Sequence, residues 1–267
     1  MLEPFSIPFM QHALIAGVLV GFLASYFGVF IVQRRMAFLG SGLAHSAFGG
    51  VALGLLLGLP PLAVALPFTI LVAVGIIWVK ERAPLAEDTT IGVFFSVSMA
   101  LGVVFLALKQ GYAGDAFAYL FGSILAVTHV DLWIVGCIAA AALATVPWWS
   151  ALAYATFDRT LARTDRLPVS VHDTALNIAM GVVVVVSMKL VGMVLIAAFL
   201  VLPAATARLV ARTFRGMTLA SIAIGISTAI VGLYVSYFAN LPSGPSIILL
   251  QSLFFFGALA FSQLRKA

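Results

Sequence analysis

Long apolar runs follow one another along almost the whole chain, and only short polar segments separate them. A helix that crosses a bilayer needs about 20 predominantly apolar residues, so runs of this length predict membrane-spanning helices. Met188 to Gly192 forms a very tight join, so we expect eight or nine spans in an all-α, polytopic membrane protein. The predicted spans are 9–32, 36–58, 61–79, 91–108, 131–154, 173–189, 191–209, 218–239 and 246–264.

One apolar segment does not fit this series. Residues 116–128 (AFAYLFGSILAVT) are too few to cross the membrane, and apolar runs of about 10–14 residues are more often re-entrant or interfacial. If this segment crossed, every later loop would change sides. We therefore expect a short helix that enters from the outer face and returns to it.

Composition supports a single transmembrane permease domain over residues 1–267. Apolar residues make up 63% of the chain and charged residues only 9%, whereas soluble domains are about half apolar and one quarter charged. The chain has no room for an additional soluble domain of ordinary size, so we expect any energy source to be another polypeptide or an ion gradient. The single cysteine, Cys137, excludes an internal disulfide and any multi-cysteine metal site.

Basic residues predict the orientation. Each odd-numbered span is followed by a basic cluster, and the positive-inside rule places such clusters in the cytoplasm. The N-terminus is then outside and the C-terminus inside, in a bacterial inner (cell) membrane. The net charge of +5 does not indicate a nucleic-acid partner, because the basic residues sit where orientation requires them. The clusters are Arg34/Arg35, Lys80/Arg82, Arg159/Arg163/Arg166, Arg208/Arg212/Arg215 and Arg265/Lys266.

Small residues recur four apart on the first two predicted spans. Gly17 and Gly21 lie on the first, and Gly50, Gly54 and Gly58 on the second. This spacing lets helix backbones approach closely. We expect the contacts to lie within one subunit, with a contact between two copies as the alternative.

His45 is the strongest candidate for chemistry. It lies near the middle of the second predicted span, where ionisable groups are costly and usually face the bundle interior or a cavity. Ser41 precedes it by four residues and so lies on the same helix face, one turn away. Imidazole is a common ligand of divalent transition metals. The alternative is a neutral histidine that is hydrogen-bonded inside the bundle.

Further polar candidates lie at the predicted ends of spans. His129 and Asp131 precede the fifth span and could attract a cation at the outer mouth, although Asp131 could equally interact with the helix dipole. Asp173 is predicted to cap the sixth span at the cytoplasmic side. Glu87 and Asp88 are predicted to be solvated loop residues.

The longest polar stretch is 156–172, predicted to be cytoplasmic. Phe157 and Leu161 are four residues apart and would share one face of a short helix. Asp158 suits the start of that helix and Arg163 its end, through the helix dipole. A short amphipathic helix fits into a partner's groove, although the segment could also simply connect two spans.

Four blocks of sequence, in order, resemble one known family. They are RRMAFLGSGLAHSAFGGVALGLLLG, AYLFGSILAVTHVDL, VSMKLVGMVLIAAFLVLPAATARLVA and LPSGPSIIL. Together they are similar to the permeases of ABC-type zinc, manganese and iron importers, and most of all to the zinc-importer permeases. The resemblance covers nearly the whole chain.

This resemblance implies the ABC metal-importer permease fold and a multi-subunit machine. Two permease copies would form a homodimer, cytoplasmic ABC ATPase subunits would drive it, and an outer-face metal-binding protein would deliver the ion. The divalent metal, with zinc favoured, would be cargo rather than a stably bound cofactor. Segment 156–172 would then contain the coupling helix, with Phe157, Asp158 and Leu161 facing the ATPase.

The chain departs from the family pattern at two positions. The family commonly has Asp where this chain has Ser41, so the carboxylate of an Asp-x-x-x-His pair is missing. Either the ion binds more loosely here, another acid substitutes, or the substrate differs. The second departure is Arg166, where the family commonly has Gly.

Other classes of function predict different features. A gradient-driven secondary transporter usually carries acids near the midplane, but no Asp or Glu lies in the interior of a predicted span. An intramembrane enzyme could use Ser41 and His45 as nucleophile and base. A purely structural subunit would show no transport. The chain lacks the G-x-x-x-x-G-K-[ST] phosphate loop, so ATP hydrolysis is expected on a partner.

Overall fold

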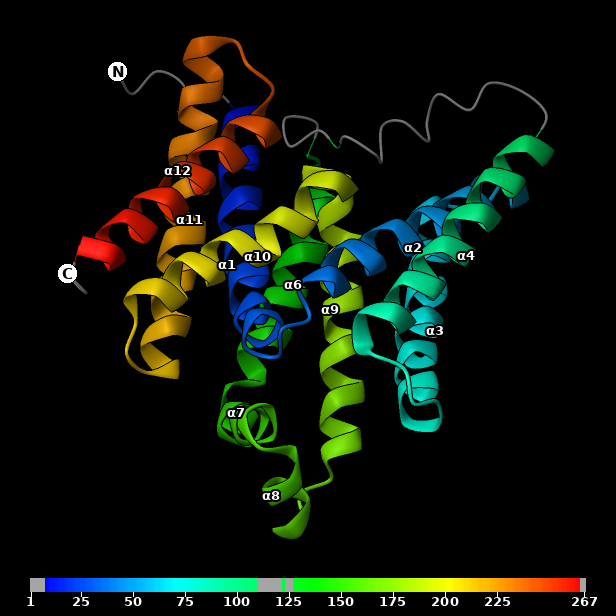
Figure 1. Ribbon diagram of the computed structural model, residues 1–267. Coiled ribbons are helices and arrows are strands. Elements are labelled where there is room, and N and C mark those ends of the chain that lie inside the picture. Colours follow the sequence, from blue (N-terminus) through cyan, green and yellow to red (C-terminus); the bar gives the residue numbers. More distant parts are fainter. Residues whose placement is uncertain (1–7, 110–121, 123–126, 265–267) are drawn as a thin grey trace.

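The computed structural model describes residues 8–109, 122 and 127–264, and every regular element in these ranges is helical. Figure 1 shows a bundle in which α1 and α9 run through the middle. The helices are α1 (Pro8–Gln33), α2 (Ala37–Leu57), α3 (Pro61–Arg82), α4 (Glu87–Leu108), α6 (His129–Ala144), η3 (Val146–Trp148), α7 (Trp149–Phe157), α8 (Arg159–Thr164), α9 (Val169–Val191), α10 (Met193–Val210), α11 (Phe214–Ala239) and α12 (Ser243–Leu264).

The predicted spans correspond closely to these helices. Eight segments of the described chain are long and apolar enough to cross a membrane, whereas the predicted span 191–209 is a shorter apolar helix. The tight join is a single residue: Gly192, with φ of 92°, ends α9 and starts α10. Such a φ suits glycine because a Cβ would be strained there. The predicted re-entrant segment 116–128 lies almost entirely outside the described residues.

The fifth predicted span, 131–154, is not one continuous α-helix. α6 stops at Ala144, a 3₁₀ turn follows over Val146–Trp148, and α7 then begins. Pro147 lies in that turn and cannot donate the backbone hydrogen bond that would continue the α-helix. In Figure 1, α7 is seen almost end-on near the lower end of α6, so the chain changes direction there.

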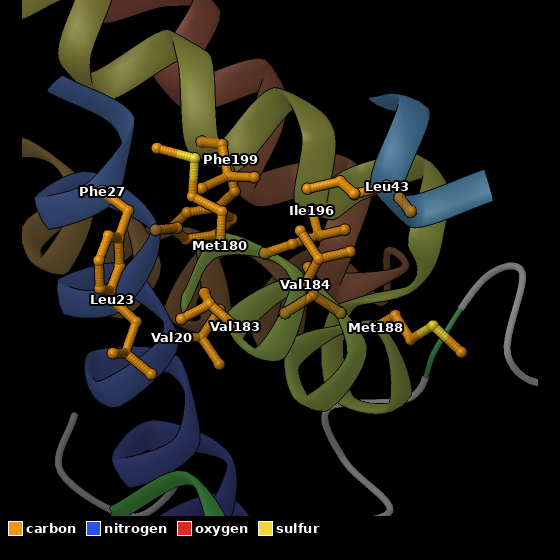
Figure 2. Close-up of a cluster of buried hydrophobic side chains, with 14 of the residues drawn as sticks. Val20, Leu23, Phe27, Leu43, Met180, Val183, Val184, Met188, Ile196 and Phe199 are labelled. Atoms are coloured by element: carbon orange, nitrogen blue, oxygen red, sulfur yellow. The ribbon is translucent and has the colours of Figure 1, made fainter. Parts of the chain in front are cut away.

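The interior is built from the middle helices. In the most apolar windows of α1 and α2, 72% of the residues are buried, against 11% in α12. Figure 2 shows the centre of this core, to which α1 contributes Leu23 and Phe27, α9 contributes Val184, and α10 contributes Ile196 and Phe199. α12 instead exposes large apolar side chains, which suits a surface that lipid covers.

Glycines let the inner helices approach closely. A methyl group added at Gly28 of α1 would lie 2.0 Å from the carbonyl oxygen of Leu200 in α10, and one at Gly40 of α2 would lie 3.0 Å from the side chain of the same leucine. The predicted Gly21 and Gly50 contacts also lie within the subunit, against α11 and α3 respectively. The small-residue spacing thus serves internal packing.

The basic clusters of the described helices gather at one end of the bundle. Arg34, Lys80 and Arg159 belong to one ion-pair network, and Arg208 Nη1 donates a hydrogen bond to the carbonyl oxygen of Val32 at 3.0 Å. This end also carries α7 and α8 (Figure 1). Lys189 lies near the opposite end of α9. The basic clusters and this single lysine are thus at opposite ends of the bundle, as the alternation of the predicted loops requires.

Candidate metal pathway and coupling site

Ser41 and His45 share one face of α2, as predicted. Both are partly buried. His45 Nδ1 lies 2.8 Å from the backbone carbonyl oxygen of Ser41 and 3.4 Å from its hydroxyl oxygen. The imidazole ring also packs against Phe95 of α4, with 4.8 Å between ring centroids.

The short contact to the carbonyl fixes the tautomer of His45. A carbonyl oxygen can only accept, so the Nδ1–H group of a neutral ring must donate to it. The lone pair then resides on Nε2, and a hydrogen bond from the other ring nitrogen to a carbonyl is the usual orientation of a metal-binding histidine. The same bond counts against an intramembrane enzyme, because Nδ1 is the nitrogen nearest Ser41 and already carries its proton.

A cavity of about 600 Å³ opens two helical turns before His45. Phe38 of α2 lines it, with Asp88 at the start of α4 and, on α10, Ala197, Ala198, Val201 and Leu202. Asp88 is therefore in the first turn of a helix rather than in a loop, and it faces a hollow. The prediction that it is a loop residue was wrong because α4 begins four residues earlier than its apolar run.

The residues predicted at the outer mouth have separate partners. Asp131 is buried; it accepts from the hydroxyl and backbone N–H of Thr128 and pairs with Lys189 of α9 at 2.5 Å. These bonds form a capping box at the start of α6. The His129 ring instead contacts that of His12 on α1, with 4.2 Å between centroids. Asp131 therefore has the helix-terminal role that was its alternative, and the attraction of a cation to His129 and Asp131 stays a prediction.

The predicted coupling segment contains a short helix, α8. Asp158 is its N-cap, since its Oδ1 accepts from the backbone N–H of Leu161 at 2.9 Å, and Arg163 lies in the last turn. Phe157 and Leu161 do not share a helix, because the backbone is extended at Asp158 and Phe157 ends α7. Both side chains are at least half exposed, and the Phe157 ring contacts Phe214 at the start of α11.

Arg166 lies where α8 ends. The N–H of Leu167 donates to the carbonyl oxygen of Ala162, and that of Arg166 donates to Arg163, both at 3.0 Å. These two bonds make a Schellman motif, which requires a left-handed residue at the position of Arg166. Its φ is 61°, a conformation that glycine adopts without strain. This geometry explains why glycine suits this position and what arginine costs there.

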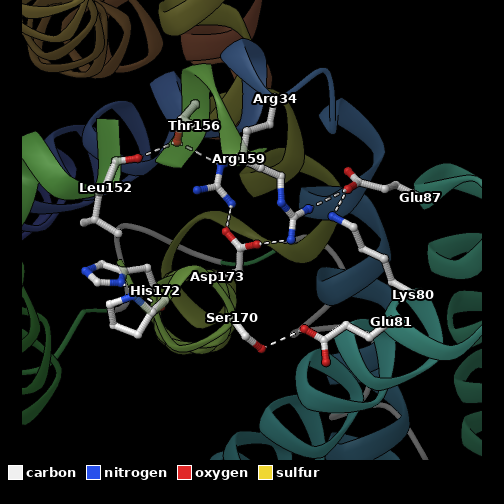
Figure 3. A network of polar contacts seen from close by, with 11 residues as sticks. Arg34, Lys80, Glu81, Glu87, Leu152, Thr156, Arg159, Ser170, His172 and Asp173 are labelled. Carbon is white, nitrogen blue, oxygen red and sulfur yellow. Dashed lines mark hydrogen bonds and ion pairs between the residues drawn. The ribbon is translucent and has the colours of Figure 1, made fainter. Parts of the chain in front are cut away.

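One buried acid holds two ion pairs that were not predicted. Asp173 is buried in the second turn of α9 rather than at its cap. Its Oδ1 accepts from Arg34 Nη1, and its Oδ2 pairs with Arg159 Nη2, each at 2.5 Å (Figure 3). Burial lowers the pKa of the Arg34 guanidinium, and the Asp173 carboxylate opposes that effect. The sequence signal was an acid directly before a long apolar run.

Known proteins resemble the chain over nearly its full length. The manganese import system permease protein ScaB of Streptococcus gordonii is 35% identical over 92% of this chain and 89% of its own. The zinc uptake membrane protein ZnuB of Haemophilus influenzae is 32% identical over 91% of this chain and 94% of its own. The relatives thus name manganese and zinc alike, and they do not favour zinc.

A solved structure agrees with the fold. PsaBC from Streptococcus pneumoniae, in complex with Fab, superimposes with a TM-score of 0.84 and 34% identity, over 96% of this chain and 92% of that one. The model of the ABC 3 transport family matches residues 6–262. This chain is therefore a multi-pass membrane permease that belongs to the ABC 3 transport family.

Proposed function

We propose that the chain is the membrane subunit of an ATP-driven importer for a divalent transition metal ion, with zinc as the favoured cargo. The family and the permease role are shared with both named relatives. The observation that supports the choice of metal is the donor set on α2: one imidazole and a neutral serine on the same helix face. Imidazole suits zinc, whereas manganese is better served by carboxylate oxygens.

Import of manganese is the second candidate. The names of the relatives support it, and so does Asp88, an oxygen ligand in the cavity beside Phe38. In this case the ion contacts His45 only briefly, and the Asp88 carboxylate replaces the acid that the family commonly has at the position of Ser41. The two candidates predict that replacement of His45 lowers the uptake of different metals: zinc in the first and manganese in the second.

Transport would proceed by alternating access. An outer-face metal-binding protein releases the ion at the end of the bundle where His12 and His129 meet. His45 then replaces part of the ion's hydration shell, and it does so weakly, since transport requires release as well as entry. ATP binding and hydrolysis on the partner subunits displace α8, and the spans open toward the cytoplasm.

Partners and placement follow from the same proposal. The end that gathers the arginines and α8 faces the cytoplasm by the positive-inside rule, which puts the N-terminus outside and the C-terminus inside. Exposed Phe157 and Leu161 insert into a groove of the cytoplasmic ATPase, with Asp158 fixing the start of α8. A second permease copy completes the pathway, because Phe38 of α2 is exposed and the cavity beside it is open at the surface of one subunit.

The test is uptake of metals by the reconstituted permease–ATPase complex in proteoliposomes with the outer-face protein present. We expect ATP-dependent accumulation of zinc, and a large loss of it in His45→Ala with normal amounts of assembled complex. Manganese uptake that survives while zinc is not transported would replace zinc by manganese as the cargo. Uptake by the permease alone, without ATP, would instead show a secondary transporter.

A further inference from the structure

One buried carboxylate joins the coupling helix to the helices that carry the candidate metal site. The Asp173 side chain is only 6% exposed, and its two oxygens face arginines from different parts of the chain. Arg34 lies in the link between α1 and α2, three residues before α2 starts. Arg159 is the first residue of α8. The carboxylate therefore bridges α8 and the base of α2.

The network reaches further through Arg159. Its Nη1 lies 3.8 Å from Glu87 at the start of α4, and Glu87 is paired with Lys80 near the end of α3. Arg34 Nε also donates to Thr156 Oγ1 of α7 at 3.0 Å. Figure 3 shows these groups gathered around Asp173. The ends of the surrounding helices thus meet at one charged cluster.

Few contacts other than the Arg159–Asp173 ion pair and a hydrogen bond between α7 and the exposed end of α8 fasten α8 to the bundle. Its buried apolar contacts are a small cluster in which Ala162 meets Ala155 of α7 and Val169 of α9. Methyl and isopropyl groups bury little area, so this contact is weak. The ion pair is the charged attachment: Arg159 Nη2 lies 2.5 Å from Asp173, whose side chain is only 6% exposed, and removing one partner of a buried charge is costly. A displacement of α8 must therefore pull on Asp173 or separate Arg159 from it.

We infer that Asp173 is a positioning residue that transmits the movement of α8 to α2. This inference rests on the proposed function, because it assumes that α8 is moved by an ATPase. Arg34 and Arg159 share one carboxylate, each on its own oxygen, so a shift of Arg159 that turns the carboxylate also moves Arg34 and the first turn of α2. His45 lies two turns further along that helix. Asp173 touches no cargo; it acts through its two arginines.

The test compares uptake and ATP hydrolysis in the same reconstituted complex. Asp173→Asn keeps the shape and removes the charge that both arginines share. We expect metal uptake to fall about fivefold or more, since coupling between sites is typically 5–150-fold. ATP hydrolysis should persist, so the ATP consumed per ion rises. Arg159→Gln should act in the same direction, and Glu87→Gln less, because Glu87 reaches Arg159 only at 3.8 Å.

Two further variants separate positioning from simple stability. Asp173→Glu retains the charge and should recover part of the uptake even if Asp173→Asn assembles poorly. Glu81→Gln is the matched control: Glu81 is an exposed acid at the same end that accepts from Ser170 of α9 but not from α8, and its variant should transport normally.

The outcomes distinguish the inference from the proposed function. The inference would be overturned if both Asp173→Asn and Arg159→Gln left the uptake and the ratio of ATP to ion unchanged. It would also be overturned if uptake, hydrolysis and the amount of assembled complex fell in parallel and Asp173→Glu did not restore them. Absence of ATP-driven uptake by the unsubstituted complex would overturn the proposed function, and the inference with it.

Discussion

Substitution of Gly28 by alanine tests the central packing of the bundle. The added methyl carbon would lie 2.0 Å from the carbonyl oxygen of Leu200 and 3.5 Å from the Cβ of Ala204. A carbon and an oxygen in contact need more than 3 Å, so α1 and α10 must separate by about 1 Å. Overpacking of this kind costs about 1–3 kcal/mol, and the gain in helix propensity from glycine to alanine offsets up to about 1 kcal/mol.

We therefore expect a net loss of about 1–2 kcal/mol in Gly28→Ala. For a chain of this size each kcal/mol lowers the melting temperature by about 2–4 °C, so the purified protein should melt about 2–8 °C earlier in detergent. Gly136→Ala is the control, because nothing lies within 4 Å of a methyl group there and α6 gains propensity. A Gly28→Ala protein as stable as the unsubstituted one, or an equally unstable Gly136→Ala, would refute the close approach of α1 and α10.

Further predictions concern transport. Asparagine has no imidazole nitrogen that could bind a metal, so His45→Asn should lower zinc uptake as His45→Ala does. Normal uptake would show that His45 is not part of the pathway. Ser41→Asp should tighten metal binding, measured by calorimetry on the complex, if this face lines the pathway. Phe157→Asp or Leu161→Asp should abolish ATP-driven uptake and release the ATPase on size-exclusion chromatography; retained transport in both would contradict the docking role. Arg166→Gly should relieve about 1 kcal/mol of left-handed strain and slow proteolysis of the loop after Arg163; faster cleavage would contradict it.

Most of the helix positions could be predicted from the sequence because lipid solvation imposes apolar runs of defined length. The ends of these runs were less predictable, since polar residues such as Glu87 and Asp88 continue a helix beyond its apolar part. The break between α6 and α7 was missed although Pro147 marked it, because the hydropathy of the run does not change there.

The candidate site was only partly predictable. Ser41 and His45 lie four residues apart on one helix, so their proximity followed from helical periodicity alone. The bonds of Asp173 did not, because Arg34 is 139 residues away in sequence and no local pattern encodes that pairing. For the same reason the contact of His129 with His12 and the pairing of Asp131 with Lys189 required the tertiary structure.

The length of α6 has a consequence for the surrounding lipid. Its 16 residues rise about 24 Å, which is less than the roughly 30 Å thickness of a typical hydrocarbon core. The chain then turns at the tryptophans Trp148 and Trp149, side chains that favour the headgroup region. The apolar segment itself continues through the turn and α7 to Phe157, so we expect local thinning of the bilayer along this flank to the extent that α7 lies at the membrane surface, at a fraction of a kcal/mol for each ångström of mismatch. Acyl-chain length is thus a variable that reconstitution of this protein should control.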